Sequence, residues 1–165
     1  IGVGMAASIL VGQAVGAEAV PLAKKALRSC LLLAVGYTLL MVLLFSVFQD
    51  LVLAPFIRPG DTAQQTTIQI SRYMLYFISG YLLIDSINIC VSNALRGAGD
   101  TKYIMNLTTI MAWGAFAIPC VIMYFIGLSV WWLWGCMSVY VLLFGFFCYR
   151  RYRSGKWARQ KVIDK

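Results

Sequence analysis

The stretch YMLYFISGYLLIDSINICVSNAL, residues 73–95, decides the fold, because it is long enough to cross a bilayer and holds a single charge, Asp85. A membrane-spanning helix needs about 20 mostly apolar residues. A carboxylate at mid-membrane depth costs roughly 2.5–3.5 kcal/mol on insertion scales, and it is tolerated where it faces a bundle interior, an aqueous cavity or a bound cation. The stretch therefore predicts a membrane helix with a functional position inside it.

The composition of the whole chain favours a membrane protein. It is 61% hydrophobic and 12% charged, with a mean hydropathy of +0.81, whereas a soluble domain is typically about 45–50% apolar and about 25% charged. There is no histidine, no nucleophile–base pair and no C-x-x-C spacing, so we expect neither an enzyme nor a cofactor. The five cysteines are expected to be small packing residues.

Apolar segments divide the chain into five expected membrane crossings, all helical, because alternating β patterns are absent. At about 1.5 Å per residue the first one is roughly 24 Å long, shorter than a hydrocarbon core of about 30 Å, so we expect a helix truncated by the start of the chain. Between the first two crossings, residues 17–29 are expected to form a short surface helix. The expected crossings, within one domain or part of one, are residues 1–16, 31–57, 73–95, 103–127 and 128–149, followed by a cytoplasmic tail, 150–165.

The basic residues lie almost entirely on one side of this arrangement. With five crossings, 12 of the 14 lysines and arginines share one side, and only Arg58 and Arg72 lie on the other. The positive-inside rule makes the crowded side cytoplasmic, together with the C-terminus. This placement accounts for the net charge of +8 without a nucleic-acid partner.

A stripe of polar side chains follows one face of the helix at residues 73–95. Tyr81, Asp85, Asn88 and Ser92 are spaced as i, i+4, i+7 and i+11. Their oxygen atoms are hard ligands that suit Na⁺ or a proton site, with Asp85 as the possible Na⁺ ligand. For Asn88 and Ser92, hydrogen bonding between packed helices is the alternative interpretation.

The next crossing carries a second polar face and a proline. Asn106, Thr109 and Trp113 lie on one face, and Pro119 is expected to free the carbonyl near Ala115 and bend the helix. Bent or broken helices often accompany transport sites.

Glycines mark a packing face and a helix end. Gly12 and Gly16 form a small-xxx-small pair, which predicts close helix packing. Gly97 is expected to end the helix of residues 73–95, with Asp100 or Thr101 capping the next helix.

Three motifs resemble the multidrug and toxic compound extrusion (MATE) family. VGQAVGA at residues 11–17, followed by Ala23, resembles a motif at a cytoplasmic helix end. ALRGAGDTK at residues 94–102 is similar to the junction between the tenth and eleventh helices of the family, and YLLID at residues 81–85 is similar to its Tyr-x-x-x-Asp pattern. The resemblance covers essentially the whole chain, as helices eight to twelve.

The resemblance implies an all-α, polytopic membrane helix bundle that is part of a twelve-helix, two-lobe antiporter. Such a protein exports small organic cations or drugs in exchange for Na⁺ or H⁺, across a bacterial-type inner membrane. Asp85 and Tyr81 would bind the coupling cation. The other expected partners are the lipid bilayer and the N-terminal lobe of the same protein. The residues expected to line the substrate cavity are Asn88, Ser92, Met74, Phe77, Ile78, Asn106, Thr109 and Trp113.

Two alternatives remain open from the sequence. A lipid-linked saccharide flippase of the same superfamily would need Lys or Arg inside its helices, and the apolar segments of this chain hold none. A small non-transporting membrane protein, such as an assembly subunit, would explain the length of the chain but would leave Asp85 without a role.

Overall fold

The computed structural model describes residues 1–49, 51 and 62–159, which form a bundle of helices without a strand in those ranges. The all-α fold class expected from the sequence is confirmed. In chain order the elements are α1 (Gly2–Gly16), α2 (Val20–Val47), α4 (Thr62–Gly97), α5 (Thr101–Ile110), the π-helix η2 (Met111–Ala117), α6 (Ile118–Ile126), α7 (Val130–Arg153) and the 3₁₀-helix η3 (Lys156–Arg159).

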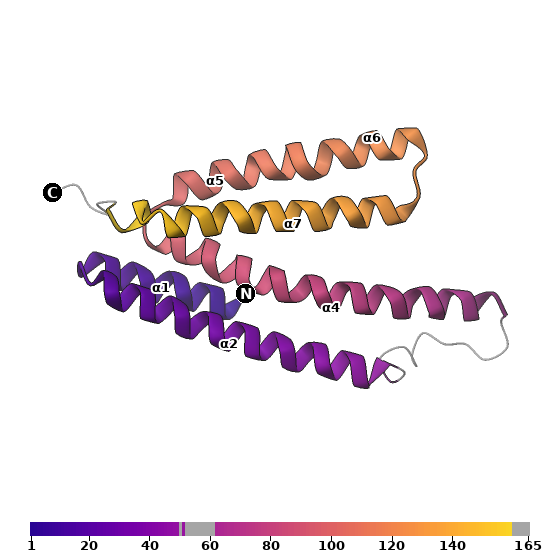
Figure 1. Ribbon diagram of the computed structural model, residues 1–165, viewed down its shortest axis with the longest axis horizontal. Helices are drawn as coiled ribbons and strands as arrows, with labels where there is room; N and C mark the ends of the chain where they lie inside the picture. The colour runs from indigo at the N-terminus through magenta and orange to yellow at the C-terminus, as the bar shows by residue number, and fades with distance from the viewer. Residues whose placement is uncertain (50, 52–61, 160–165) are drawn as a thin grey trace.

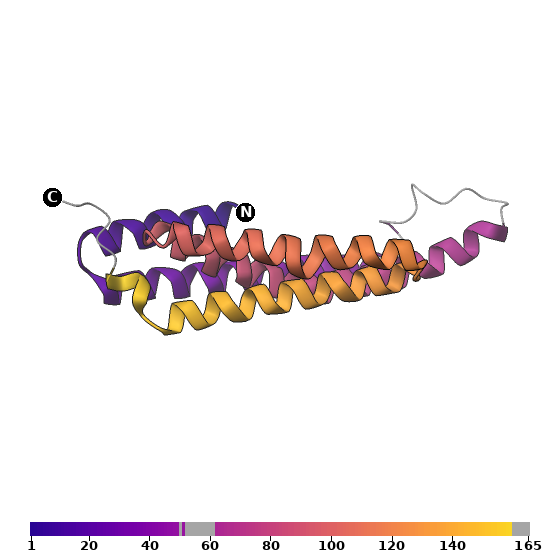
Figure 2. The same ribbon diagram turned by 90° about the horizontal axis from the view of Figure 1, so that it is seen from above.

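Helix α4 lies at the centre of the bundle (Figure 1). It contacts α1 and α2 on one side and α7 on the other, while α5, η2 and α6 continue one another alongside α7 (Figures 1 and 2). Four helical stretches in the described ranges are long and apolar enough to cross a membrane, and α1 is shorter. They are Val20–Val47, Tyr73–Gly97, Thr101–Ile126 and Trp131–Arg153.

Helix α2 corrects the expectation for residues 17–29. It begins at Val20 and runs without a break into the second expected crossing, so there is no separate surface helix. Pro21 lies in its first turn, where a fixed φ and a missing N–H favour helix initiation. One buried face continues through the whole stretch, formed by Ala23, Leu27, Cys30 and Ala34. Of the expected crossing 31–57, residues 50 and 52–57 lie outside the described residues.

The residues expected to form a tail, 150–165, are partly built into the fold. Helix α7 continues to Arg153, and the chain then turns back through η3. Trp157 is buried, its ring stacks on Tyr152 with centroids 5.5 Å apart, and its indole N–H donates to the Tyr152 carbonyl at 2.8 Å. Burial of an indole against the bundle therefore fixes this turn. Residues 160–165 lie outside the described part.

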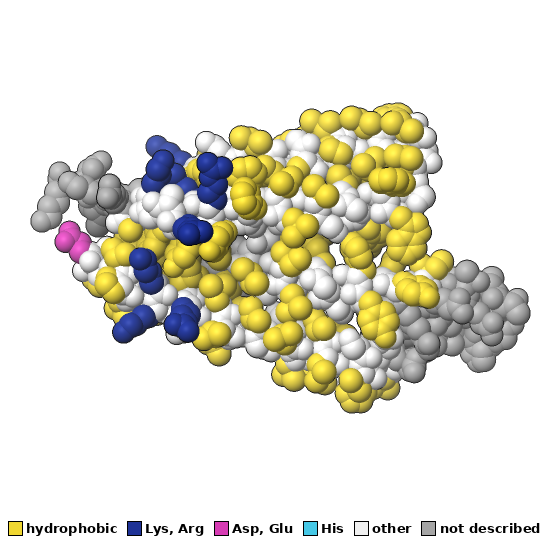
Figure 3. All heavy atoms as spheres, viewed as in Figure 1, with side chains coloured by type: hydrophobic (Ala, Val, Ile, Leu, Met, Phe, Trp, Pro, Cys, Tyr) yellow, Lys and Arg dark blue, Asp and Glu magenta, His cyan; other side chains and the backbone are white. Residues whose placement is uncertain are grey.

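The buried core lies toward the end of the bundle where α1 turns into α2 and α4 into α5. Its largest fully buried side chains include Leu27, Leu95 and Ile104. Lysines and arginines gather at this same end, and apolar side chains cover the remaining length of the visible face (Figure 3). This distribution fits helices whose apolar sides face lipid or further protein.

Helices α1 and α4 approach each other along a face of small residues. A Cβ atom at Gly97 would collide with the Ser8 carbonyl, and one at Gly12 would lie 2.8 Å from the Gly97 carbonyl oxygen. Gly4 continues the same face one turn before Ser8. The expected packing role of Gly12 is confirmed, whereas a Cβ atom at Gly16 would meet nothing within 4 Å.

Gly97→Ala should destabilise the protein, because the added methyl group would overlap the backbone of α1 at Ser8. Overpacking of this kind costs about 1–3 kcal/mol. Gly16→Ala is the matched control, since its methyl group would meet no neighbour within 4 Å. Thermal unfolding of the full-length protein in detergent measures both variants. Equal Tm values would contradict the close α1–α4 contact.

An ion pair ties the α4–α5 turn to α7. Arg151 donates from Nε to Oδ2 of Asp100 at 2.6 Å and from Nη2 to Oδ1 at 3.0 Å. The guanidinium also lies 4.5 Å from the centre of the Tyr103 ring. Asp100 occupies the N-cap position of α5, but its side chain makes no capping hydrogen bond. Asp100 is thus at the cap position expected for it, but its buried carboxylate binds Arg151 and makes no capping hydrogen bond.

Arg151→Met should destabilise the full-length protein strongly, because it leaves the Asp100 carboxylate, 2% exposed, without this partner. Removing one member of a buried ion pair costs about 3–5 kcal/mol, and we expect the lower end because the Arg151 side chain is 19% exposed. The adjacent, exposed Arg150 provides the control substitution Arg150→Met. A loss of Tm as large in the Arg150 variant would argue against a specific role of the pair.

Candidate functional site

Asp85 lies in the middle of the spanning part of α4, where it is half-buried. Its carboxylate is within electrostatic reach of two phenol groups, Tyr81 one turn earlier on α4 and Tyr140 on α7. The structure therefore brings together the expected pair, Asp85 and Tyr81, and adds a third group from another helix. A partly buried carboxylate with hydroxyl groups in its vicinity can bind a proton or a small hard cation.

Tyr140 is held in place by aromatic neighbours. Its ring stacks on Phe144 with centroids 6.2 Å apart, and it lies 5.9 Å from the ring of Phe116 in η2. Sequence reasoning missed Tyr140 because α7 contains many aromatic residues. Only the pairing of α7 with α4 shows that this one lies near Asp85.

Asn88 and Ser92, the other half of the polar stripe, are buried in helix contacts. The Asn88 amide donates to the Val141 carbonyl of α7 at 2.9 Å, and Gly145 leaves the space for this side chain. Ser92 donates to the Ile89 carbonyl in its own helix at 3.2 Å. These contacts match the packing alternative, and a cavity-lining role for the two residues stays a prediction.

Three apolar residues expected near the cavity lie toward the other end of α4. Phe77 meets Trp134 of α7 edge to face, with ring centroids 5.7 Å apart. Met74 and Phe77 line a shallow apolar hollow together with Trp131 and Trp134. Ile78 is partly buried.

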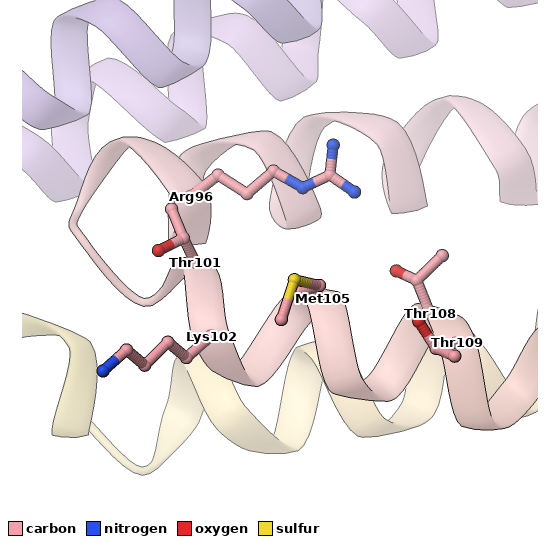
Figure 4. A pocket seen from close by; sticks show the side chains of 6 residues that line it. All are labelled: Arg96, Thr101, Lys102, Met105, Thr108 and Thr109. Atoms are coloured by element: carbon pink, nitrogen blue, oxygen red, sulfur yellow. The ribbon is translucent and has the colours of Figure 1, made fainter.

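Asn106, Thr109 and Trp113 lie apart from this group, on α5 and η2. All three are exposed, Trp113 by 65%. Thr109 lines a pocket between the end of α4 and the start of α5, together with five other residues (Figure 4). Their expected role in the substrate cavity stays a prediction.

The proline in this part of the chain has the expected effect on hydrogen bonding. Pro119 follows the π-helix η2, and the carbonyl of Ala115, four residues earlier, accepts a hydrogen bond from the Cys136 thiol of α7 at 3.2 Å. Proline cannot donate to that carbonyl, so a neighbouring helix satisfies it, as membrane helices require. Cys136 therefore has a hydrogen-bonding role in addition to the packing role expected of it.

A cation at Asp85 would need further oxygen ligands. Across residues 1–49, 51 and 62–159, no group of three or more His, Cys, Asp or Glu side chains is placed to hold a metal ion. Tyr81 and Tyr140 are the hydroxyl groups within electrostatic reach of Asp85. Further ligands would be carbonyl groups, water or residues of another part of the protein.

Comparisons with known proteins agree with the motifs. Two curated relatives are each described as a probable multidrug resistance protein NorM. The one from Pasteurella multocida (strain Pm70) is 30% identical over 110 residues, which cover 67% of this chain and 23% of the relative. The one from Haemophilus ducreyi (strain 35000HP / ATCC 700724) is 26% identical over 111 residues, with the same two coverages, 67% and 23%. The chain thus spans less than a quarter of the length of these relatives.

No solved structure matches the chain. The family model described as MatE matches residues 1–123, a segment that includes α1, α2, α4 and the Tyr81–Asp85 pair. Because this match covers most of the sequence, the chain belongs to the MatE family.

Proposed function

We propose that this chain is part of a secondary active transporter that exports organic cations or drugs in exchange for Na⁺ or H⁺. The observation that carries the proposal is the position of Asp85, in the middle of a spanning helix and within electrostatic reach of two phenol groups. The family membership, and the description of both relatives as probable multidrug resistance proteins, support export of drugs.

The coupling follows from competition for Asp85. A proton or Na⁺ neutralises the carboxylate, and this changes the relative free energies of the two access states. When the Asp85 carboxylate is ionised, it attracts an organic cation instead. Binding of the coupling ion from outside therefore favours release of the drug. Tyr81 and Tyr140 would stabilise the bound ion through their hydroxyl oxygens.

The orientation in the membrane is part of the proposal. The end of the bundle that carries the α1–α2 and α4–α5 turns is rich in lysine and arginine (Figure 3). The positive-inside rule assigns such an end to the cytoplasm, so the C-terminus would be cytoplasmic in a bacterial-type inner membrane. Exposed apolar residues such as Leu32 and Leu33, each 66% exposed, would face lipid or the other lobe of the transporter.

Asp85→Asn in the full-length protein should abolish cation-driven export, because the amide can neither bind a proton nor attract a cation by charge. Cells that express this variant should accumulate a fluorescent dye cation at the level of cells without the transporter. The measurement is dye accumulation at equal amounts of protein in the membrane.

Ser86→Ala is the matched control for this experiment. Ser86 is adjacent on α4, and its hydroxyl donates to the Leu83 carbonyl of the same helix, at 2.9 Å. This variant should export normally. Undiminished, ion-driven dye efflux by Asp85→Asn would overturn the proposed function.

Tyr140→Phe should weaken coupling-ion binding without unfolding the site, because it removes the hydroxyl near Asp85 and keeps the ring that stacks on Phe144. Loss of one hydrogen-bonding group corresponds to about a three- to tenfold rise in the ion concentration that gives half-maximal efflux. Tyr149→Phe, at an exposed position of α7, controls for the chemical change. An equal ion dependence in the two variants would remove Tyr140 from the site.

A further inference from the structure

A pocket of about 370 Å³ lies between the last turn of α4 and the first turns of α5. Its lining consists of Arg96, Thr101, Lys102, Met105, Thr108 and Thr109 (Figure 4). The volume falls within the range of about 300–1,000 Å³ that is typical of small-ligand sites. None of the lining residues belongs to the group around Asp85.

The pocket carries two positive charges and no carboxylate. Asp100, which separates Arg96 from Lys102 in the turn, is bound by Arg151 through both of its oxygens. Within the described ranges Arg96 and Lys102 have no ion-pair partner. The lining is therefore complementary to an anion.

The side chain of Arg96 extends along the pocket in the direction of Thr108, whereas that of Lys102 extends the opposite way (Figure 4). Side chains in a helix tilt toward its N-terminus, so Arg96 is directed from the last turn of α4 back along the membrane-crossing part. A guanidinium that lies close to the membrane boundary is stabilised by an anionic partner there.

The remaining polar groups of the pocket suit an oxyanion that only accepts hydrogen bonds. Thr101 and Thr109 are exposed and can donate their hydroxyl hydrogens, while the Thr108 hydroxyl donates to the Ile104 carbonyl at 2.8 Å. Arginine, lysine and threonine donors together are the usual partners of phosphate oxygens.

We propose that this pocket binds the phosphate group of an anionic phospholipid. The lipid, rather than soluble phosphate, is favoured by the surroundings of the pocket. Met105 in the lining is 61% exposed and Ile110, farther along α5, is 66% exposed, so an apolar surface continues from the pocket along a spanning helix where acyl chains would lie. The site goes beyond the proposed transport function and does not depend on it.

The test is native mass spectrometry of the full-length protein purified in detergent, with added phosphatidylglycerol or phosphatidylcholine. The protein should retain phosphatidylglycerol in preference to phosphatidylcholine. The double variant Arg96→Gln with Lys102→Gln should bind phosphatidylglycerol about 30-fold more weakly, given the usual contribution of each basic residue at an anionic surface.

The matched control is the double variant Lys24→Gln with Lys25→Gln, which removes two exposed charges from α2 without touching the pocket. It should bind phosphatidylglycerol like the unmodified protein. Arg96→Lys, which keeps the charge, should bind closer to the unmodified protein than the double glutamine variant does, and this outcome would exclude misfolding as the cause.

Equal retention of phosphatidylglycerol by the two double glutamine variants would overturn the proposal. A calorimetric titration with inorganic phosphate, without lipid, separates the two sources of phosphate. If inorganic phosphate does not bind, the result supports the phospholipid as the ligand of the pocket. Millimolar binding that the Arg96, Lys102 double variant loses would overturn the lipid as the ligand and assign the pocket to soluble phosphate.

Discussion

The ion pair between Asp100 and Arg151 holds the end of α4 against the end of α7. The two helices run in the same direction (Figure 1), and the pair joins them near their C-terminal ends. Farther along, two further contacts join the helices in the same order on each: Asn88 with Val141, and Phe77 with Trp134. The ion pair thus helps to hold α7, which carries Tyr140, beside α4, which carries Asp85.

The polar stripe of α4 divides between two tasks. Toward the basic end, Asn88 and Ser92 are buried and their hydrogen bonds join or stiffen helices. Toward the middle of the span, Asp85 and Tyr81 remain partly accessible. A membrane interior penalises both an unpaired polar group and an isolated charge. Polar residues with partners within the bundle can thus serve packing, while a partly accessible carboxylate is suited to an exchangeable partner such as an ion.

Part of this structure could be predicted from the sequence, because it depends on residues that lie close together in the chain. Hydropathy located the long spans, and Gly97 ends α4 as its position before a turn suggested. Features that depend on which helices pair were not predictable. The continuous start of α2, the burial of Trp157 and the approach of Tyr140 to Asp85 all arise from contacts between segments distant in sequence. No periodicity within one helix reports on such contacts.

The π-helix at Met111–Ala117 interrupts the regular periodicity of a spanning stretch. Each turn of a π-helix takes up more residues than an α-turn, because its hydrogen bonds join residues i and i+5. The side chains of α6 therefore point in other directions about the helix axis than they would if one continuous α-helix ran from Thr101 to Ile126. Helical-wheel projections must restart at Ile118. The loss of one residue here would restore an ordinary α-helix and leave the same α6 side chains facing α7, whereas an α-helix of the present length would turn a different set toward it.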